Sequence, residues 1–453
     1  MSARSQQAWV VEQYQAAVDV ASDESVEVVH GEDVLPARLA TSELAVGAVV
    51  VAAGAALRLL HARTGHHGAA TVDGRRVSAS FRSDRHFRLD GAEIEAFAPL
   101  SGFWRTRDGW VRTHANYPHH RMRLLGALGL SEETTPAQLA AVLAERDRLD
   151  VEQRLVDAGA IGVAVRSPEE WAAHPQASAV AALPLVGSTR LDDAPPRPIP
   201  DMPRDTHQPA MGLRVLDFTR VIAGPVASRT LALLGADVLR VDSPRLPEIA
   251  WQHLDSGMGK RSTLLDLRTE RGTVEELLRD AHVLIVGYRP DALARYGLAP
   301  GDVTARHPGL VVATLNAWGG VGPWGQRRGF DSIVQAATGI AVIEGDESAP
   351  GALPAQALDH ATGYLLAGAV LDAVVRQRSH AGSVHVQAHL ARTAAALLEH
   401  RDSMPRQLPD VSDLLRQRTT SGGVLTYAPP TLHIAGTPDD WDTVGGQWGA
   451  DPP

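Results

Sequence analysis

The stretch that most constrains the fold of this chain is residues 211–244, MGLRVLDFTRVIAGPVASRTLALLGADVLRVDSP. It opens with an apolar run at 213–218 that is typical of a buried parallel strand. A helix is expected at 226–234, because a Gly-Pro pair suits its start and apolar residues then recur at helical spacing. A second strand follows at 238–241. Such a strand–helix–strand unit is right-handed, and its first loop faces the carboxyl end of the sheet, where α/β proteins bind ligands.

The loop after the first strand carries no GxGxxG fingerprint, so the pattern does not indicate a dinucleotide, and a purely architectural unit stays open as an alternative. The alternation of strands and helices continues to about residue 401. Further strands are expected at 262–267, 282–287, 310–315 and 384–389. Strands that alternate with helices predict a mostly parallel, Rossmann-like sheet of the α/β class.

Composition limits the classes of function. The net charge is −10 and no long basic run appears, which disfavours nucleic acid or an anionic membrane as the main partner. Cysteine is absent, so disulfides, thiolate metal sites and cysteine nucleophiles are excluded, and no metal is expected. The first residues lack the long apolar core of a secretory signal, and the apolar segment 44–57 falls short of the roughly 20 residues of a membrane span. We therefore expect a cytoplasmic protein in which this segment is an internal helix.

The chain is expected to divide into five segments. Residues 187–210 hold six prolines and no apolar periodicity, which is typical of an extended linker. Before them lies a smaller α+β region, in which 70–81 is expected as a strand and 103–111 as a hairpin that turns at an Asp-Gly pair. The segments are an N-terminal extension at 1–40, the smaller domain at 41–186, the linker at 187–210, the Rossmann-like domain at 211–401 and a Pro- and Gly-rich surface tail at 402–453.

An internal echo appears when residues 43–85 are laid over 359–395. In both segments an acidic residue, Glu43 or Asp359, precedes an Ala-rich helix, a basic turn and a strand. The overlay needs a one-residue shift. A duplication is one interpretation, and shared Ala/Gly composition is the other.

Five segments between residues 210 and 395 resemble known sequence motifs, and the spacing of apolar residues alone could not establish this resemblance. They are FTRVIAGPVASRTLALLGADVLRVDSP, GKRSTLLDLRTERG, AHVLIVGYRPDALARYGL, NAWGGVGPWGQRRGFDSIVQAATGI and ALDHATGYLLAGAVLDAVVRQRSHAG. In this order they resemble the motifs of the class III CoA-transferases, the CaiB/BaiF family. The resemblance implies a Rossmann-like large domain plus a smaller domain, two interlocked chains in a homodimer, and an acyl-CoA and a carboxylic acid as substrates.

The resemblance also implies a nucleophile, the Asp that begins the Ala/Gly-rich helix, which is Asp359 in this sequence. An ionised carboxylate at a helix N-terminus can attack an acyl-CoA thioester to form a mixed anhydride. Coenzyme A then returns to give an aspartyl-CoA thioester, and an acceptor carboxylate takes the CoA. The alternative is that Asp359 only caps its helix, a contribution of about 1 kcal/mol.

Further positions match the family's motifs one by one, and their charges suit the phosphates of CoA. The CoA-binding residues implied are Arg220, Val221, Lys260, Arg261 and Arg295. Arg245 and Arg289 are weaker candidates, because surface arginines are commonly solvated. The substrate residues implied are His360, beside the nucleophile, and Asn116 and Tyr117, which follow the hairpin that matches the family's small domain. Residues 41–186 are thus expected to pack beside Asp359.

Three departures of this sequence from the family's pattern bear on the predicted function. Phe330-Asp331 stands where the racemase branch has a His-Asp pair, so the imidazole for α-proton exchange is missing and a CoA-transferase is favoured over a racemase or isomerase. Small-domain-like residues precede the large-domain motifs, as in a fused or permuted pair of truncated copies, with Glu43 where the first copy's Asp would be. No Gly-rich lid is found in the sequence. A non-catalytic CoA-binding or assembly subunit is therefore the rival interpretation.

Overall fold

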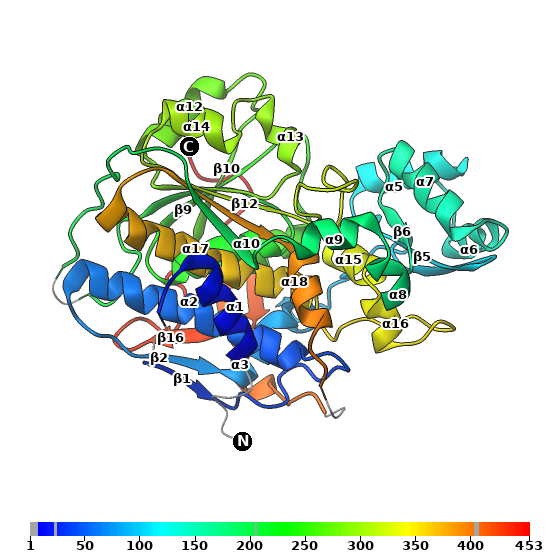
Figure 1. Ribbon diagram of the computed structural model, residues 1–453, viewed down its shortest axis with the longest axis horizontal. Coiled ribbons are helices and arrows are strands. Elements are labelled where there is room, and N and C mark those ends of the chain that lie inside the picture. Colours follow the sequence, from blue (N-terminus) through cyan, green and yellow to red (C-terminus); the bar gives the residue numbers. More distant parts are fainter. Residues whose placement is uncertain (1–7, 22–24, 204–205, 403–406) are drawn as a thin grey trace.

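In the computed structural model, which describes residues 8–21, 25–203, 206–402 and 407–453, a seven-stranded sheet forms the centre of the protein (Figure 1). The strand order is β10-β9-β8-β11-β12-β13-β7. The strands are β7 (Val186–Arg190), β8 (Arg214–Phe218), β9 (Asp237–Asp242), β10 (Lys260–Leu264), β11 (Val283–Val286), β12 (Val311–Asn316) and β13 (Val384–His389). All pairs are parallel except that of β7 with β13. The predicted α/β fold with a mostly parallel sheet is therefore confirmed.

The strand–helix–strand unit at the start of the large sheet forms as predicted. β8 pairs in parallel with β9, with Val215 opposite Val238, and α10 (Ala223–Leu233) connects them. Apolar residues of these strands are buried on both faces of the sheet, Val215 and Val238 in one cluster and Leu216 and Leu239 in another, because helices cover both sides. The loop after β8 opens at the carboxyl end of the sheet, beside the loops after β9 to β12.

Two sets of helices cover the two faces of the sheet and lie on opposite sides of it in Figure 1. One set is α12 (Arg271–Asp280), α13 (Pro290–Ala294) and α14 (Pro300–Arg306). Leu278, Leu293 and Val303 of these helices join one apolar cluster with the strands. The other set comprises α10, α17 (Ala357–His380) and α18 (Leu390–Leu398), which belong to the main core.

Two long helices, α2 (Thr41–Thr64) and α17, pack side by side against each other (Figure 1). Both have 24 residues, and both follow an N-cap residue of similar conformation, Ala40 at φ −72°, ψ 54° and Gln356 at φ −75°, ψ 63°. Glu43 and Asp359 each stand third in their helix. The internal echo seen in the sequence thus has a structural counterpart.

Small residues let α2 and α17 approach closely. A Cβ on Gly368 would lie 2.9 Å from Cγ1 of Val51. Arg58 Nε of α2 donates to Asp372 Oδ1 of α17 at 2.8 Å, and the Tyr14 hydroxyl of α1 (Ala8–Val18) donates to Oδ2 at 2.7 Å. Both long helices pass a length and hydropathy test for a membrane span, but 83% and 94% of their apolar windows are buried inside the protein, as in core helices.

A smaller α+β unit stands at one side of the sheet, with its helices in cyan in Figure 1. Its elements are β4 (Phe103–Thr106), β5 (Gly109–Thr113), α5 (Pro118–Leu128), α6 (Pro136–Ala144), α7 (Arg148–Asp157) and β6 (Gly162–Ala164). The hairpin predicted at 103–111 is present as β4 and β5. An apolar cluster from Leu100 to Ala160 belongs to this unit alone. The unit is therefore narrower than the expected 41–186 domain, because α2 belongs to the main core.

The N-terminal third corrects one predicted strand. The elements there are β1 (Val26–Val29), β2 (Ala70–Asp73), α3 (Gly74–Phe81), α4 (Ser83–His86) and β3 (Arg88–Leu89). The strand expected at 70–81 stops at Asp73, whose side chain accepts a hydrogen bond from the N–H of Arg75 at 2.9 Å. Asp73 thereby caps α3, and the residues that follow it form a helix.

The linker expected at 187–210 is corrected as well. Its first residues belong to β7, which pairs with β13 at the edge of the sheet. The chain beyond β7 is held by side chains that donate to main-chain carbonyls: Arg63 donates to Pro200, and Arg197 donates to Leu278, both at 2.7 Å. The segment is thus an anchored surface strap, and a flexible-coil estimate of its reach does not apply.

The C-terminal segment, expected as a surface tail, adds strands to two small sheets. β14 (Arg416–Thr420) pairs with β15 (Gly423–Tyr427), and β15 pairs in turn with β3. In the other sheet, β16 (Leu432–Ile434) pairs with β2. Trp441 is buried, and its Nε1 donates to the Arg229 carbonyl at 3.0 Å. The remaining elements are α8 (Pro168–Ala172), α9 (Pro175–Ala181), α11 (Ala250–Ser256), α15 (Asp331–Ala337), α16 (Ile340–Glu344) and a 3-10 helix (Ser412–Leu414). Parts of the expected extension, linker and tail, at 1–7, 22–24, 204–205 and 403–406, lie outside the described residues.

Candidate active site

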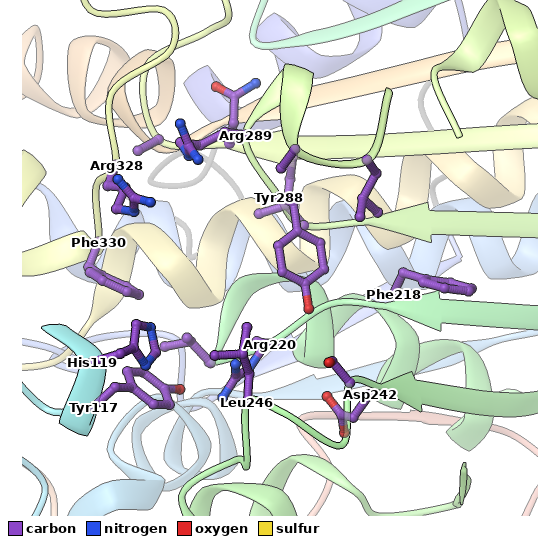
Figure 2. Close-up of a pocket in the computed structure, with 18 of the residues that line it drawn as sticks. Tyr117, His119, Phe218, Arg220, Asp242, Leu246, Tyr288, Arg289, Arg328 and Phe330 are labelled. Atoms are coloured by element: carbon purple, nitrogen blue, oxygen red, sulfur yellow. The ribbon is translucent and has the colours of Figure 1, made fainter. Parts of the chain in front are cut away.

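A cavity of 590 Å³ opens at the carboxyl ends of β8 to β12, where the smaller unit meets the sheet (Figure 2). The loops after these strands supply most of its wall, the start of α5 contributes from the smaller unit, and Ile161, Asp359 and Leu390 complete the lining. Its lining includes Tyr117, His119, Arg220, Asp242, Tyr288, Arg328, Phe330 and Asp359. Parallel α/β sheets bind ligands at this edge.

Asp359 lies in the first turn of α17 and forms part of the cavity wall, with only 6% of the residue exposed. Its N–H donates to Oδ2 of Asp331 at 2.9 Å. Asp331 is the first residue of α15 and is fully buried, and the side-chain amide of Gln335 donates to its other oxygen. Asp331 thus satisfies a free N–H at the start of α17 and holds the backbone of Asp359 in place.

Both carboxyl groups titrate above their usual range. Burial raises the pKa of Asp331 to about 6, even though hydrogen bonds from the Asp359 N–H and from Gln335 lower it. Burial, followed by the charge of Asp331, raises the pKa of Asp359 well above its ordinary value. Since the hydrogen-bond donors surround Asp331, the negative charge of the pair resides there and the proton on Asp359. Once that proton leaves, Asp359 is a poorly solvated carboxylate, which is a reactive nucleophile.

A buried charge cluster locks the loop after β8 to the start of α5. Glu248 accepts a hydrogen bond from the Tyr117 hydroxyl and pairs with Arg220 at 3.4 Å and with Arg240 at 2.9 Å. The Arg220 guanidinium also lies 4.7 Å over the Tyr117 ring. Burial raises the pKa of Glu248, but the two arginines outweigh it and hold the pKa at about 2. Val221, which follows Arg220 in the chain, has φ 72°. This backbone conformation is strained for a β-branched residue, and strained residues of this kind are found at binding sites.

The structure brings together most of the predicted site residues. Arg220, Val221, Arg295, Tyr117 and Asp359 all line the cavity. Asn116 and His360 line a small adjoining cavity of 50 Å³, which Tyr117 and Asp359 also touch. The smaller unit thus packs beside Asp359 in the expected way.

Lys260 and Arg261 do not reach either cavity, which corrects their expected contact with CoA. They begin β10, whereas the large cavity lies at the other end of that strand, beside Asp266. Lys260 is buried and pairs with Asp217 at 3.0 Å, and Arg261 pairs with the exposed Asp237 at 3.0 Å. Both cations therefore pair with carboxylates of other strands in the same sheet.

Asn116 and His360 shape the wall of the small cavity. The Asn116 Oδ1 accepts from the Ser101 hydroxyl at 2.7 Å, and its Nδ2 donates to the Ala96 carbonyl at 3.1 Å, so its amide is engaged within its own loop. His360 is buried and stacks on Phe81 with ring centroids 4.8 Å apart. Burial lowers the pKa of His360 to about 3, so the ring is neutral.

Positive charge dominates the wall of the large cavity. Arg245 and Arg289 line it, and so do Arg123, Arg268 and Arg328, which the sequence alone did not indicate. Arg245 and Arg268 pair with Asp266 at 2.8 and 2.9 Å. The salt bridges between described residues include none from Arg123, Arg289 or Arg328. Figure 2 shows Arg289 and Arg328 on one wall, across from Tyr117 and His119.

The fold and the cavity define an α/β protein with a buried carboxyl group, that of Asp359, in the wall of a cavity at the carboxyl edge of its sheet. Residues 211–405 match the model of CoA-transferase family III. This part of the chain is therefore similar to the class III, or CaiB/BaiF, CoA-transferases.

Similarity to individual relatives extends over part of each protein. The chain is 35% identical over 207 residues to the probable fatty acyl-CoA transferase Rv3272 of Mycobacterium tuberculosis, which is 42% of this chain and 52% of the relative. It is 28% identical over 246 residues to succinyl-CoA:glutarate CoA-transferase of Homo sapiens, 51% and 55% of the two chains. The chain thus spans about half the length of these curated relatives. A crystal structure of a CaiB/BaiF family protein from Brucella suis aligns at 26% identity over 48% of this chain and 65% of that chain, with a TM-score of 0.39.

Proposed function

We propose that the protein is a CoA-transferase that moves CoA from an acyl-CoA thioester to a carboxylic acid through Asp359. The observation that carries the proposal is the buried Asp359 carboxyl at the junction of the large cavity and its small neighbour. A group in that position meets a thioester that enters through the large cavity while the acyl chain enters the small one. The match of residues 211–405 to the model of CoA-transferase family III supports the role of CoA.

The large cavity suits the phosphates of CoA. Arg123, Arg289 and Arg328 supply positive charge without a carboxylate partner among the described residues, and arginine binds phosphate through paired N–H bonds. Arg295, which also lines the cavity, lies 4.8 Å over the ring of Tyr296. Arg220 is already paired with Glu248, so its contribution is to fix the loop that carries Val221.

In the proposed reaction the Asp359 carboxylate attacks the thioester carbonyl, the C–S bond breaks and CoA leaves as the thiolate. The thiolate attacks the Asp359 carbonyl of the mixed anhydride and releases the donor acid. The acceptor carboxylate then attacks the aspartyl-CoA thioester, and the thiolate set free attacks the acceptor's carbonyl, which restores Asp359. Each step exchanges one acyl bond for another, and the buried position of Asp359 keeps water from hydrolysing the intermediates.

A racemase or isomerase of the same family and a non-catalytic CoA-binding or assembly subunit are the alternatives. Phe330 occupies the position of the imidazole that the racemase branch uses, and its ring stacks on His114 at 3.9 Å. We further propose that the protein acts in the cytoplasm as a homodimer, without nucleic acid, membrane or metal. Because α2 and α17 cover each other, their Ala/Gly-rich faces do not supply the dimer contact.

Intact-mass spectrometry tests the proposal. Wild-type protein incubated with an acyl-CoA is expected to gain the mass of the acyl group or of CoA. Hydroxylamine should then convert activated Asp359 to a hydroxamate, which peptide mapping locates. Asp359→Ala should lose this adduct and reduce CoA transfer by about four orders of magnitude or more, while CoA affinity measured by calorimetry stays near that of wild type.

Glu43→Gln is the matched control, because Glu43 holds the same position in α2. Its Oε2 accepts from the Trp9 Nε1–H at 3.0 Å, and it lines neither the large nor the small cavity. This variant should keep both adduct and turnover. Turnover by Asp359→Ala, or an equal loss in Glu43→Gln, contradicts the assignment of Asp359 as the nucleophile.

A further inference from the structure

A third cavity, of 240 Å³, adjoins the small one beside Asp359. Its wall includes Phe97, Phe103, Arg112, Ser332, Gln335 and Gln356. Phe97 and Gln356 also line the small cavity, and Gln356 is the N-cap of α17, three residues before Asp359. An acyl chain attached to the Asp359 carboxyl can therefore extend through the small cavity toward the third one.

Arg112 of β5 places an uncompensated charge in the third cavity. Its guanidinium lies 5.1 Å from the centre of the Phe97 ring and 4.8 Å from that of Phe103. Its Nε is buried without a hydrogen-bond partner, and no salt bridge between described residues involves it. Burial lowers the pKa of Arg112 to about 10, which leaves the group charged at neutral pH. Aromatic contacts offset only part of the cost of removing this charge from water.

Some arginines of this unit or next to it have an acidic partner, whereas others, such as Arg105 and Arg123, form no salt bridge between described residues. Arg107 pairs with Asp147, Arg154 with Asp150, and Arg166 with Glu152. At the wall of the third cavity, Asp84 and Arg85 lie 3.6 Å apart and balance each other. Ser332, on the same wall, is buried, and its hydroxyl has no hydrogen-bond partner among the described residues. The wall of the third cavity thus includes two side chains, Arg112 and Ser332, that each have a buried polar atom without a described partner, and it carries a net positive charge.

We propose that Arg112 binds the distal carboxylate of a dicarboxylic substrate, with the Ser332 hydroxyl as a second donor. The inference rests on the proposed function and names its substrate class: donor acyl groups and acceptor acids that carry a second carboxylate. A carboxylate accepts two parallel N–H bonds from a guanidinium, which satisfies the charge and the donors at once. Because donor and acceptor occupy the acyl site in turn, the same arginine selects both.

Transfer assays with two series of acceptors test the proposal. Dicarboxylates from malonate to adipate are compared with monocarboxylates of the same chain length, each as kcat/KM for CoA transfer from a common donor thioester. Wild type should prefer one of the dicarboxylates over its monocarboxylate counterpart by tenfold or more. In Arg112→Gln this preference should fall at least tenfold, and Ser332→Ala should reduce it by a smaller factor. An unchanged preference in Arg112→Gln overturns the proposal.

Arg105→Gln is the matched control, because Arg105 of β4 also stacks on an aromatic ring, that of Trp110 at 5.4 Å, but does not line the third cavity. It should keep the wild-type preference. Thermal unfolding of each variant shows whether it folds, and Arg112→Met, which keeps the length of the stacked side chain, replaces Arg112→Gln if that variant does not.

Calorimetric titration of the free protein with glutarate separates this inference from the proposed function. Saturable binding that Arg112→Gln and Ser332→Ala weaken supports the carboxylate site even when no CoA transfer is detected, in which case only the proposed function fails. CoA transfer that shows no preference for dicarboxylates, together with no binding of glutarate, overturns the dicarboxylate site and leaves the transferase intact.

Discussion

At the scale of single residues, the site depends on two carboxyl groups that differ in their hydrogen bonds. Asp331 receives the N–H of Asp359 and the amide of Gln335, whereas no hydrogen bond to the Asp359 carboxyl is present among the described residues. The first group is therefore the better place for the negative charge, and the second carries the proton until substrate binds. Asp331 positions Asp359 and tunes its ionisation without lying on the wall of the large cavity.

Asp331→Asn should move the acid limb of the pH–rate profile to lower pH. The charge of Asp331, after burial, raises the pKa of Asp359, so removal of that charge lets Asp359 ionise in more acidic solution. The measurement is kcat/KM for CoA transfer as a function of pH. Asp266→Asn is the control, since this carboxylate pairs with Arg245 and Arg268 at the cavity wall and should leave the acid limb in place. An acid limb that does not move in Asp331→Asn contradicts the coupling of the two groups.

Asp359→Asn should stabilise the protein at alkaline pH. The folded-state pKa of Asp359 is raised above the unfolded value of about 3.9, so the folded state binds this proton more tightly. The resulting stability is fully present below about pH 4 and is lost as pH rises through the folded-state pKa. The variant avoids this loss and should gain about 1–3 kcal/mol in free energy of unfolding at pH 8, with the gain vanishing near pH 4. Urea denaturation at the two pH values measures it, and a pH-independent difference speaks against the shift.

At the scale of elements, α2 and α17 form a pair in which α17 carries Asp359, the proposed nucleophile, and α2 packs against it. The buried Asp372 of α17 receives hydrogen bonds from Arg58 of α2 and from Tyr14 of α1. Loss of Arg58 or Tyr14 leaves the negative charge of Asp372 incompletely compensated inside the helix pair. The small residues along the contact only permit the two helices to approach closely.

Arg58→Ala should destabilise the fold by about 3 kcal/mol, because it leaves the buried Asp372 with Tyr14 and without a cation. The value lies at the lower end of the range for broken buried pairs, since Arg58 is itself partly exposed. Arg261→Ala is the comparison: its pair with Asp237 is exposed, and its loss should cost less than about 1 kcal/mol. Denaturant unfolding measures both. Equal effects in the two variants would show that the ion pair between Arg58 and Asp372 contributes no more to stability than an exposed ion pair does.

Local patterns predicted the elements whose signals are local. β8, α10 and β9 follow from apolar periodicity and from the Gly-Pro helix start, and the large sheet follows from their repetition. β7, β15 and β16 pair with strands far away in the sequence, so their short and partly polar segments looked like linker and tail. The helix at 74–81 was hidden because its N-cap, Asp73, also ends an alternating run.

The residues of the site also fall into two groups, those that local sequence motifs indicate and those that depend on contacts between distant segments. Asp359, Arg220, Val221, Arg295 and Tyr117 lie in motifs or beside them, and these positions were accessible from the sequence. The tuning of Asp359 by Asp331, the buried Glu248 and the lone charge of Arg112 exist only through contacts between distant segments. Lys260 and Arg261 failed as ligands because a motif does not reveal which end of a strand faces the cavity.

At the scale of the whole molecule, the three cavities are lined by residues from segments that lie far apart in the chain. The smaller unit reaches the carboxyl edge of the sheet through Tyr117, which Glu248 and Arg220 hold by a hydrogen bond and a stacked guanidinium. The resemblance to the CaiB/BaiF family implies two interlocked chains. In this structure, residues of the smaller unit and of the large sheet from the same chain already meet at the large cavity.

CoA transfer should therefore not depend on dimer formation, although we propose that a homodimer exists. Specific activity should stay constant when the protein is diluted through the concentration at which light scattering shows the dimer separating into single chains. The physical reason is that Asp359, Tyr117 and the cavity arginines remain in contact within each chain. Tyr117→Ala supplies the contrast, since it removes the link between the smaller unit and the loop of Arg220 and should lower activity at every concentration. Activity that falls in proportion to the dimer fraction would mean that a second chain completes the site.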